Sequence, residues 1–180
     1  MRVITGSARG RKLTTLEGMD IVRPTADSVK EAMFSIIQFE LENRRVLDLF
    51  AGCGQLGIEA ISRGAKHCTF VEKNKQALAV LKENVKNCKM TDNADIINTD
   101  AISFLGGVGL YDIAILDPPY NKDLINTALP MLTGHMSGNG LIICESEIGE
   151  ELLQECNLWK IIKIYKYGKT KLTVYRKVAD

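Results

Sequence analysis

Three glycines and two carboxylates stand at a spacing that suits the binding of a nucleoside. Gly52, Gly54 and Gly57 form G-x-G-x-x-G directly after a short apolar stretch that ends near Asp48, and Glu72 lies 20 positions beyond Gly52. Glycines let a ligand lie against the backbone where a Cβ would collide, and a carboxylate at the end of the next strand can accept hydrogen bonds from ribose hydroxyls. The pattern predicts a nucleoside-containing cofactor and leaves both NAD and S-adenosyl-L-methionine open. The competing interpretation is a glycine turn that serves only tight packing.

A second chemical signal is the segment Asp117-Pro118-Pro119-Tyr120, which follows a predicted strand over 113–116. The two prolines fix φ and remove N–H donors, so carbonyl groups and a carboxylate remain as hydrogen-bond acceptors. An exocyclic amine of a nucleobase would supply the donors, and Tyr120 offers a flat face to an unstacked base. With the amine nitrogen aimed at a sulfonium methyl group, Asp117 could accept the proton that is released. The segment could also be only a rigid turn.

The pattern of apolar residues indicates which elements position these segments. Strands are predicted over 46–50, 68–71, 95–98, 113–116 and 141–144. Helices are predicted from Thr25 or Asp27 to about residue 41, and over 56–63, 75–88, 124–132 and 150–157. This alternation predicts an α/β fold with a parallel sheet and helices on both faces. Residues 160–166 and 171–177 predict a terminal antiparallel hairpin, and residues 1–24 predict one or two short strands or a hairpin.

The composition is typical of one folded domain. The chain has 180 residues, of which 46% are hydrophobic and 25% are charged. No apolar run approaches the ~18–20 residues that span a bilayer, so we expect a cytoplasmic protein without membrane contact. Five cysteines without C-x-x-C spacing and two distant histidines predict neither a disulfide framework nor a metal site. We therefore expect a single domain over 1–180, with a basic extension over 1–24 and a core over 25–180.

Charge is segregated along the chain, although the net charge is only +1. Residues 1–91 carry 15 Lys/Arg and 10 Asp/Glu, residues 92–155 carry one Lys and 11 Asp/Glu, and residues 156–180 carry seven Lys/Arg and one Asp. Basic ends suit contacts with nucleic-acid phosphates, and the alternative for the N-terminal cluster is a solvated surface hairpin. The acidic residues from Glu145 to Glu155 are expected on a solvated helix face.

Several stretches together are similar to one bacterial family. They are RGRKL at 9–13, RPTADSVKEAMF at 23–34, DLFAGCGQLGIEAISRGA at 48–65, FVEKN at 70–74 and LDPPY at 116–120. In this order they resemble the ribosomal small subunit methyltransferase D family, which belongs to the class I S-adenosyl-L-methionine-dependent methyltransferases. The resemblance runs from residue 1 to the terminal hairpin. It implies a Rossmann-like fold with a seven-stranded, mostly parallel sheet, a C-terminal antiparallel hairpin and a small N-terminal β-hairpin extension.

The same resemblance implies a reaction and a partner. The methyl donor would be S-adenosyl-L-methionine, S-adenosyl-L-homocysteine would be left, and the target would be the N2 amine of a guanine in 16S rRNA. The substrate would be the small ribosomal subunit or its assembly intermediate. No metal would take part.

The resemblance also assigns roles by position. Asp48, Gly52 and Gly54 would line the methionine half of the cofactor, Glu72 would hold the ribose, and Asp100 would bind the adenine amine. From the residues alone, Asp48 could instead be a buried carboxylate that accepts backbone N–H groups, and Asp100 could be a helix N-cap.

The remaining assignments concern the substrate. The resemblance implies that the target guanine is held by Asp117, Pro118 and Tyr120. The residues implied in contacts with rRNA or near the cleft are Arg9, Arg11, Lys12, Arg23 and Thr25.

Three other functions remain open from the motifs. A DNA amino-methyltransferase, acting on adenine N6 or cytosine N4, would share the D-P-P-Y segment, but 180 residues leave no room for a separate target-recognition domain. A non-catalytic RNA chaperone that binds S-adenosyl-L-methionine could share the fold. A dehydrogenase is the weakest alternative, because D-P-P-Y has no role in hydride transfer.

Overall fold

Strands and helices alternate along the chain as the apolar pattern predicts. The computed structural model describes residues 1–16 and 24–178, with the backbone alone for 24–26. The helices are α1 (Pro24–Ile37), α2 (Gln55–Ser62), α3 (Lys75–Asn87), α4 (Ala101–Leu105) and α5 (Leu124–Leu132), with 3-10 turns at Thr91–Asn93 and Thr133–His135. The strands are β1 (Arg45–Asp48), β2 (His67–Val71), β3 (Ala94–Ile97), β4 (Tyr111–Leu116), β5 (Met136–Glu147), β6 (Glu155–Cys156), β7 (Trp159–Tyr167) and β8 (Thr170–Lys177).

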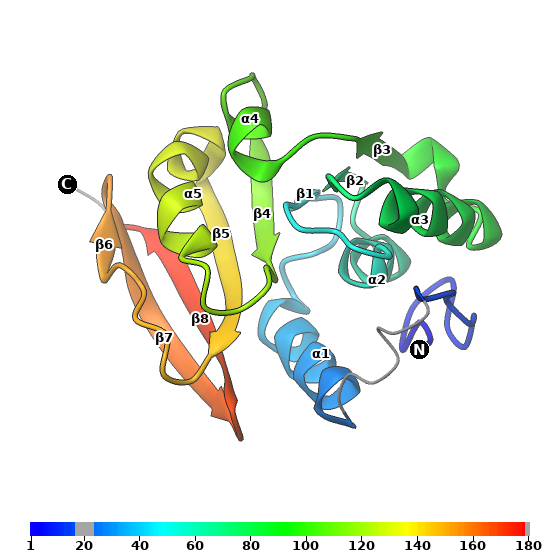
Figure 1. The fold of residues 1–180 in the computed structure, drawn as a ribbon, viewed down its shortest axis with the longest axis horizontal. Helices are drawn as coiled ribbons and strands as arrows, with labels where there is room; N and C mark the ends of the chain where they lie inside the picture. The colour runs from blue at the N-terminus through cyan, green and yellow to red at the C-terminus, as the bar shows by residue number, and fades with distance from the viewer. Residues whose placement is uncertain (17–23, 179–180) are drawn as a thin grey trace.

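All eight strands form one sheet in the order β3-β2-β1-β4-β5-β8-β7-β6 (Figure 1). Strands β1 to β5 are parallel to one another, whereas β8, β7 and β6 add to the sheet in antiparallel pairs. This arrangement confirms the predicted mostly parallel sheet and terminal hairpin. The count differs by one from the expected seven, because β6 pairs two residues with the start of β7.

The segment over 150–157 is not the predicted helix. Its only regular element is β6, and Asn157 and Leu158 that follow have φ angles of 49° and 67°. A right-handed helix cannot include such residues, and the turn that they form sends the chain into β7. The prediction was wrong because a few leucines and glutamates at helical spacing fit an irregular loop equally well.

The helices cover both faces of the sheet, which confirms the second part of the predicted architecture. Helices α1, α2 and α3 contribute to one apolar cluster, which includes Phe34, Ile58 and Leu81. Helices α4 and α5 contribute to the other cluster, which includes Leu105 and Leu129. Helix α1 ends at Ile37, earlier than predicted, yet Leu41 beyond it is fully buried and explains why the apolar pattern continues.

The N-terminal segment is docked on the core. A single antiparallel bridge between Arg2 and Lys12 closes it, so it is a loop with one bridge and not a regular hairpin. Val3, Ala8 and Leu13 are buried and belong to the cluster beneath α2 and α3. Residues 1–16 of the predicted extension therefore have a fixed place on the core, and the division at residue 24 stays a prediction.

Two kinds of feature are absent from the described residues. None of the described helices is long and apolar enough to cross a bilayer. Over 1–16 and 24–178, no three His, Cys, Asp or Glu side chains gather in a way that could hold a metal ion.

Candidate active site

The acidic residues singled out above meet at one edge of the sheet. Asp48 ends β1, Glu72 follows β2, Asp117 follows β4, and Glu145 lies near the end of β5. Because these four strands are parallel, their carboxyl ends share an edge, which is where open α/β sheets bind ligands (Figure 1).

Glu72 braces the glycine loop against the end of β2. Its Oε2 accepts a hydrogen bond from Gly52 N at 2.8 Å, and its Oε1 accepts one from Asn74 N at 2.7 Å. The amide of Ala51 donates to Val71 O at 3.0 Å and adds a third tie. A carboxylate has about four lone-pair sites, so this brace leaves acceptor capacity for ribose hydroxyls.

The glycines of the loop have different reasons for being glycine. A Cβ on Gly54, at φ 84°, would lie 2.2 Å from Leu81 Cδ1, and one on Gly57 would lie 2.2 Å from Phe70 Cε1. These two positions need glycine for tight packing. Gly52, at φ 54°, has nothing within 4 Å of its Cβ position. Of the three glycines, only Gly52 therefore opens onto free space in which a ligand could lie. Ligand binding would explain the glycine at position 52, and tight packing explains those at positions 54 and 57.

Asp48 is buried at the base of the same loop. Its Oδ2 accepts a hydrogen bond from Gly57 N at 2.9 Å, whereas its buried Oδ1 accepts none from the described residues. Burial raises the pKa of the carboxyl group to about 7, and the nearby charge of Glu72 adds to the rise. A buried acceptor without a donor fits a ligand that carries an ammonium group, such as the methionine end of S-adenosyl-L-methionine.

Asp100 is a helix cap, as one of its two interpretations predicts. Its Oδ1 accepts hydrogen bonds from Ile102 N at 3.1 Å and Ser103 N at 3.0 Å at the start of α4. Hydrogen bonds from Ser103 are the main reason that the pKa of this exposed carboxyl group is lowered. The cap explains the residue type, and the adenine contact stays a prediction that the cap does not exclude.

The Asp117–Tyr120 segment is held in place by β5 and β8. Tyr120 donates a hydrogen bond from its hydroxyl to Glu145 Oε1 at 2.8 Å and lies 3.2 Å from Thr170 Oγ1. Within the segment, Pro118 is buried and Asp117 is partly buried, so the acidic group is still reached by solvent. The half-buried ring of Tyr120 thus has a fixed position beside Asp117.

The next turn of the same loop has a second anchor. Asn121 Nδ2 donates to Glu147 Oε2 at 2.6 Å, and Asn121 has a φ of 58°. Sequence reasoning missed the role of Glu145 and Glu147, which lie in β5 and not on a solvated helix face. The available signal was that Glu145 directly follows the apolar stretch over 141–144, as Asp117 directly follows the one over 113–116.

The basic residues of the N-terminal segment lie on the surface. Arg9, Arg11 and Lys12 are exposed, and Arg11 Nη1 donates to Asn87 O at 2.7 Å at the end of α3. Thr25 lies in the first turn of α1. Arg23 lies outside the described residues, so its predicted contact with rRNA stays a prediction.

Two buried polar side chains connect this segment to the rest of the protein. Glu59 accepts hydrogen bonds from Ile4 N at 2.8 Å and Thr5 N at 3.0 Å. Asn84 Nδ2 donates both to Thr14 O and to Cys53 O, each at 2.9 Å. Because Cys53 lies between the glycines of the loop, one amide of α3 joins the N-terminal segment to the candidate cofactor loop.

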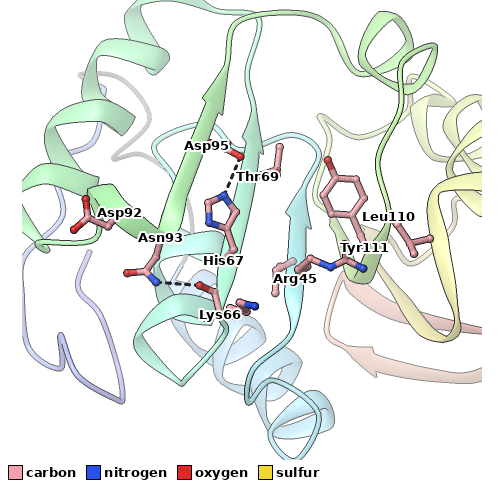
Figure 2. A pocket seen from close by; sticks show the side chains of 10 residues that line it. Arg45, Lys66, His67, Thr69, Asp92, Asn93, Asp95, Leu110 and Tyr111 are labelled. Carbon is pink, nitrogen blue, oxygen red and sulfur yellow. Dashed lines mark hydrogen bonds and ion pairs between the residues drawn. The ribbon is translucent and has the colours of Figure 1, made fainter.

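A pocket of about 520 Å³ lies at the opposite edge of the sheet. It is at the amino ends of β1, β2 and β4, between Arg45, His67 and Tyr111 (Figure 2). Two of its basic groups have acidic partners. His67 Nε2 lies 2.9 Å from Asp95 Oδ2, as Figure 2 shows, and Arg45 Nε lies 3.8 Å from Asp112 Oδ2. None of the predicted site residues lines this pocket, so it is separate from the candidate site.

Comparisons with known proteins agree over nearly the whole chain. The family model described as conserved hypothetical protein 95 matches residues 1–176. YlbH of Bacillus subtilis is 35% identical, over 98% of this chain and 99% of that protein. Ribosomal RNA small subunit methyltransferase D of Haemophilus influenzae is also 35% identical, over 98% of this chain and 93% of that protein. The solved structure of yhhF from Escherichia coli is 31% identical with a TM-score of 0.86, and the match covers 100% of this chain and 99% of that chain. These similarities confirm the expected Rossmann-like methyltransferase fold.

Proposed function

The chain belongs to the ribosomal RNA small subunit methyltransferase D family, and from that premise we propose that it methylates 16S rRNA in the small ribosomal subunit or its assembly intermediate. The methyl donor is S-adenosyl-L-methionine, and the target is the N2 amine of a guanine. The chain acts as a single domain, in the cytoplasm where its substrate is found. No metal takes part in the reaction.

One observation carries the proposal. The acceptor-rich segment from Asp117 to Tyr120 lies at the same sheet edge as Asp48 and Glu72, and Glu145 fixes its aromatic ring. A cofactor over the glycine loop and a base on Tyr120 would therefore share one cleft. The arrangement suits transfer of a methyl group to an amine. The two prolines have no N–H group, so the segment surrounds the amine mainly with hydrogen-bond acceptors.

The cofactor would be held by residues of β1 and β2. Asp48 Oδ1 would accept from the ammonium group, Gly52 would leave room for the chain of the ligand, and Glu72 would accept from the ribose hydroxyls. Gly54 would shape the loop on which the ligand lies. Asp100 would bind the adenine amine from the start of α4. When bound, the cofactor supplies an electrophilic methyl group.

The substrate would be oriented by the segment after β4. The carboxylate of Asp117 and the carbonyl of Pro118 would accept the two N–H bonds of the guanine amine, while the base stacks on Tyr120. This orientation aims the nitrogen at the methyl group, and Asp117 takes the proton that the nitrogen loses as its new bond to carbon forms. The base must be unstacked to reach the cleft, at a cost of roughly a few kcal/mol.

The test is transfer of labelled methyl from S-adenosyl-L-methionine to small subunits that lack the modification, beside naked 16S rRNA and duplex DNA. N2-methylguanosine after nucleoside analysis of the rRNA supports the proposal. Asp117→Asn should abolish transfer. Asp112→Asn is a matched control, because this carboxylate lies near the start of β4, at the opposite edge of the sheet from Asp117.

Three other results would contradict the proposal. Label on DNA would favour an amino-methyltransferase of DNA, and cofactor binding without any transfer would favour an RNA chaperone. Full activity of Asp117→Asn would remove the assigned chemistry from this segment.

A further inference from the structure

The last two strands of the sheet, β7 and β8, carry basic residues and no acidic residue of their own. From residue 157 to residue 179 the sequence has no Asp or Glu, and its basic residues are Lys160, Lys163, Lys166, Lys169, Lys171, Arg176 and Lys177. All of them lie in β7, in β8 or in the turn between them.

Some of these cations are already engaged by the protein. Lys160 Nζ lies 3.1 Å from Glu155 Oε2, Lys171 Nζ donates to Ile148 O at 3.4 Å, and Arg176 pairs with Glu40. Lys166 and Lys169 differ from them: both are exposed, and within residues 1–16 and 24–178 no acidic side chain forms an ion pair with either. Two lysines near the turn are therefore free to bind another molecule.

The turn of this hairpin lies beside the candidate active site. Lys169 O accepts a hydrogen bond from Ile148 N at 2.8 Å, and Thr170 pairs with Glu147 across β5 and β8. The side chain of Thr170 also lies 3.2 Å from the hydroxyl of Tyr120. Lys169 is thus one residue away from a contact with the ring that we assign to the target base.

The loop after β4 adds another cation at the same place. Lys122 is the one basic residue between residues 92 and 155, and it is exposed. Its neighbour Asn121 is joined to Glu147, which is the strand partner of Thr170. The cations of the hairpin turn and of this loop therefore border the candidate base site.

The N-terminal basic segment lies on the other side of the candidate active site from the hairpin. It packs against α2 and α3, whereas the hairpin extends the sheet beyond β5, and Figure 1 shows the two segments on opposite flanks of α1. A strand of RNA that presents a base to Tyr120 would have phosphates leading away in two directions. Exposed basic side chains on each flank, namely Arg9, Arg11 and Lys12 on one and Lys166 and Lys169 on the other, match such a backbone in charge.

On this basis we propose that the turn of the β7–β8 hairpin, through Lys166 and Lys169, is a second RNA-binding surface that holds phosphates next to the target nucleotide. The proposal rests on the proposed function in one respect, which is that the ligand of the site is RNA. An acidic protein partner is the alternative occupant that the test must exclude.

The experiment compares K166Q/K169Q with K177Q. Lys177 lies in the same hairpin at the end away from the turn, where it pairs with Trp159. Binding of each full-length variant to small subunits is measured at increasing salt. Each lost phosphate contact lowers the slope of log affinity against log salt by about 0.7 to 0.9, so the double variant should lose about 1.5 and K177Q about none. The KM of K166Q/K169Q for subunits should rise several-fold, while its kcat at saturation should stay within about twofold of wild type.

A second measurement needs no substitution. Lysine acetylation of the wild-type protein, with and without 16S rRNA, should show protection of Lys166 and Lys169 by RNA, while Lys177 reacts equally in both. Unchanged acetylation of all three lysines, or a wild-type salt slope for K166Q/K169Q with a wild-type melting temperature, would overturn the proposal. Protection by an acidic protein but not by rRNA would also overturn it.

The outcomes separate this inference from the function on which it rests. If the wild-type protein binds rRNA through the hairpin but transfers no methyl group, the proposed reaction fails and the surface stands. If the wild-type protein methylates subunits and the double variant has an unchanged slope and KM, the surface fails and the reaction stands.

Discussion

The hydroxyl of Tyr120 donates a hydrogen bond to Oε1 of Glu145 at 2.8 Å, and this contact joins the loop after β4 to the end of β5. Glu145 is 8% exposed, so the contact lies where water competes weakly. A ring tethered at its hydroxyl keeps its faces in one orientation. The consequence is that Tyr120 can act as a platform without ordering itself when a base arrives.

Tyr120→Ala should weaken productive binding of the target. Loss of the stacking face costs about 1–3 kcal/mol, which lowers kcat/KM roughly 5- to 150-fold. Tyr120→Phe keeps the face and loses only the tether to Glu145, so its kcat/KM should fall by less than about tenfold. Steady-state kinetics with small subunits provide the measurement. Equal losses in the two variants would show that the hydroxyl, and not the ring, is what the reaction needs.

Sequence reasoning located this loop but not what holds it. An acid and two prolines after a short apolar strand are visible from residue types and spacing alone. The tether depends on which strand lies next to β4, and Glu145 is distant from Tyr120 along the chain. Such a pairing follows from the strand order, which the sequence pattern does not determine.

In the glycine loop, too, the sequence pattern leaves a tertiary contact undetermined. The spacing of Gly52 and Gly54 predicts a ligand-binding turn, but it does not say which glycine faces the ligand. That distinction depends on Leu81 of α3, whose methyl group fills the space above Gly54. Tertiary packing therefore decides a question that the motif leaves open.

Alanine substitutions in this loop should have different effects at its two glycines. Gly54→Ala would place a methyl group 2.2 Å from Leu81 Cδ1 at a φ of 84°, so it should lower the free energy of unfolding by about 1–3 kcal/mol. Gly52→Ala meets no atom and should cost about 1 kcal/mol for its backbone conformation alone.

The second expected difference concerns the cofactor. Gly52→Ala should weaken binding of S-adenosyl-L-methionine beyond detection or by a large factor, because its methyl group enters the space that we assign to the ligand. Denaturant unfolding and calorimetric titration test the two effects separately. Wild-type affinity in Gly52→Ala would show that the cofactor does not lie against this residue.

Asp48 should make the stability of the cofactor-free protein depend on pH. Burial raises the pKa of this group from 3.8 to about 7, so the folded state binds a proton more tightly than the unfolded chain does between these values. The free energy of unfolding should therefore fall as pH rises through this window, by at most about 1.4 kcal/mol per unit, and should level off above it.

Asp48→Asn isolates this contribution. The amide oxygen can still accept from Gly57 N, but the group no longer titrates, so the variant should lack the decline between pH 5 and pH 7. Denaturant unfolding of both proteins from pH 5 to pH 8 gives the difference, in which the histidines cancel. Parallel pH curves for the two proteins would mean that Asp48 is ionised throughout.

Glu59 should contribute more to stability than its ion-pair partner Lys30 does. Its side chain is fully buried and accepts hydrogen bonds from Ile4 N, Thr5 N and Arg63 Nε, while Lys30 Nζ lies 3.5 Å away. Glu59→Ala leaves several buried donors without an acceptor, for which about 3–5 kcal/mol is the usual scale. Lys30→Met removes one cation from a carboxylate that keeps its other donors, so the loss should be clearly smaller.

Glu59→Ala should also loosen the N-terminal segment more than Lys30→Met does. Without Glu59 the amides of Ile4 and Thr5 lose their anchor, so limited proteolysis should cleave within residues 1–16 faster in Glu59→Ala than in Lys30→Met. If the segment grips rRNA, Glu59→Ala should also raise the KM for small subunits more than it changes kcat. Because Lys30 Nζ also donates to Arg2 O at 3.0 Å, both variants are compared with the wild-type protein. Wild-type cleavage rates in both variants would assign the docking of this segment to its buried apolar residues, because Val3, Ala8 and Leu13 are unchanged in both.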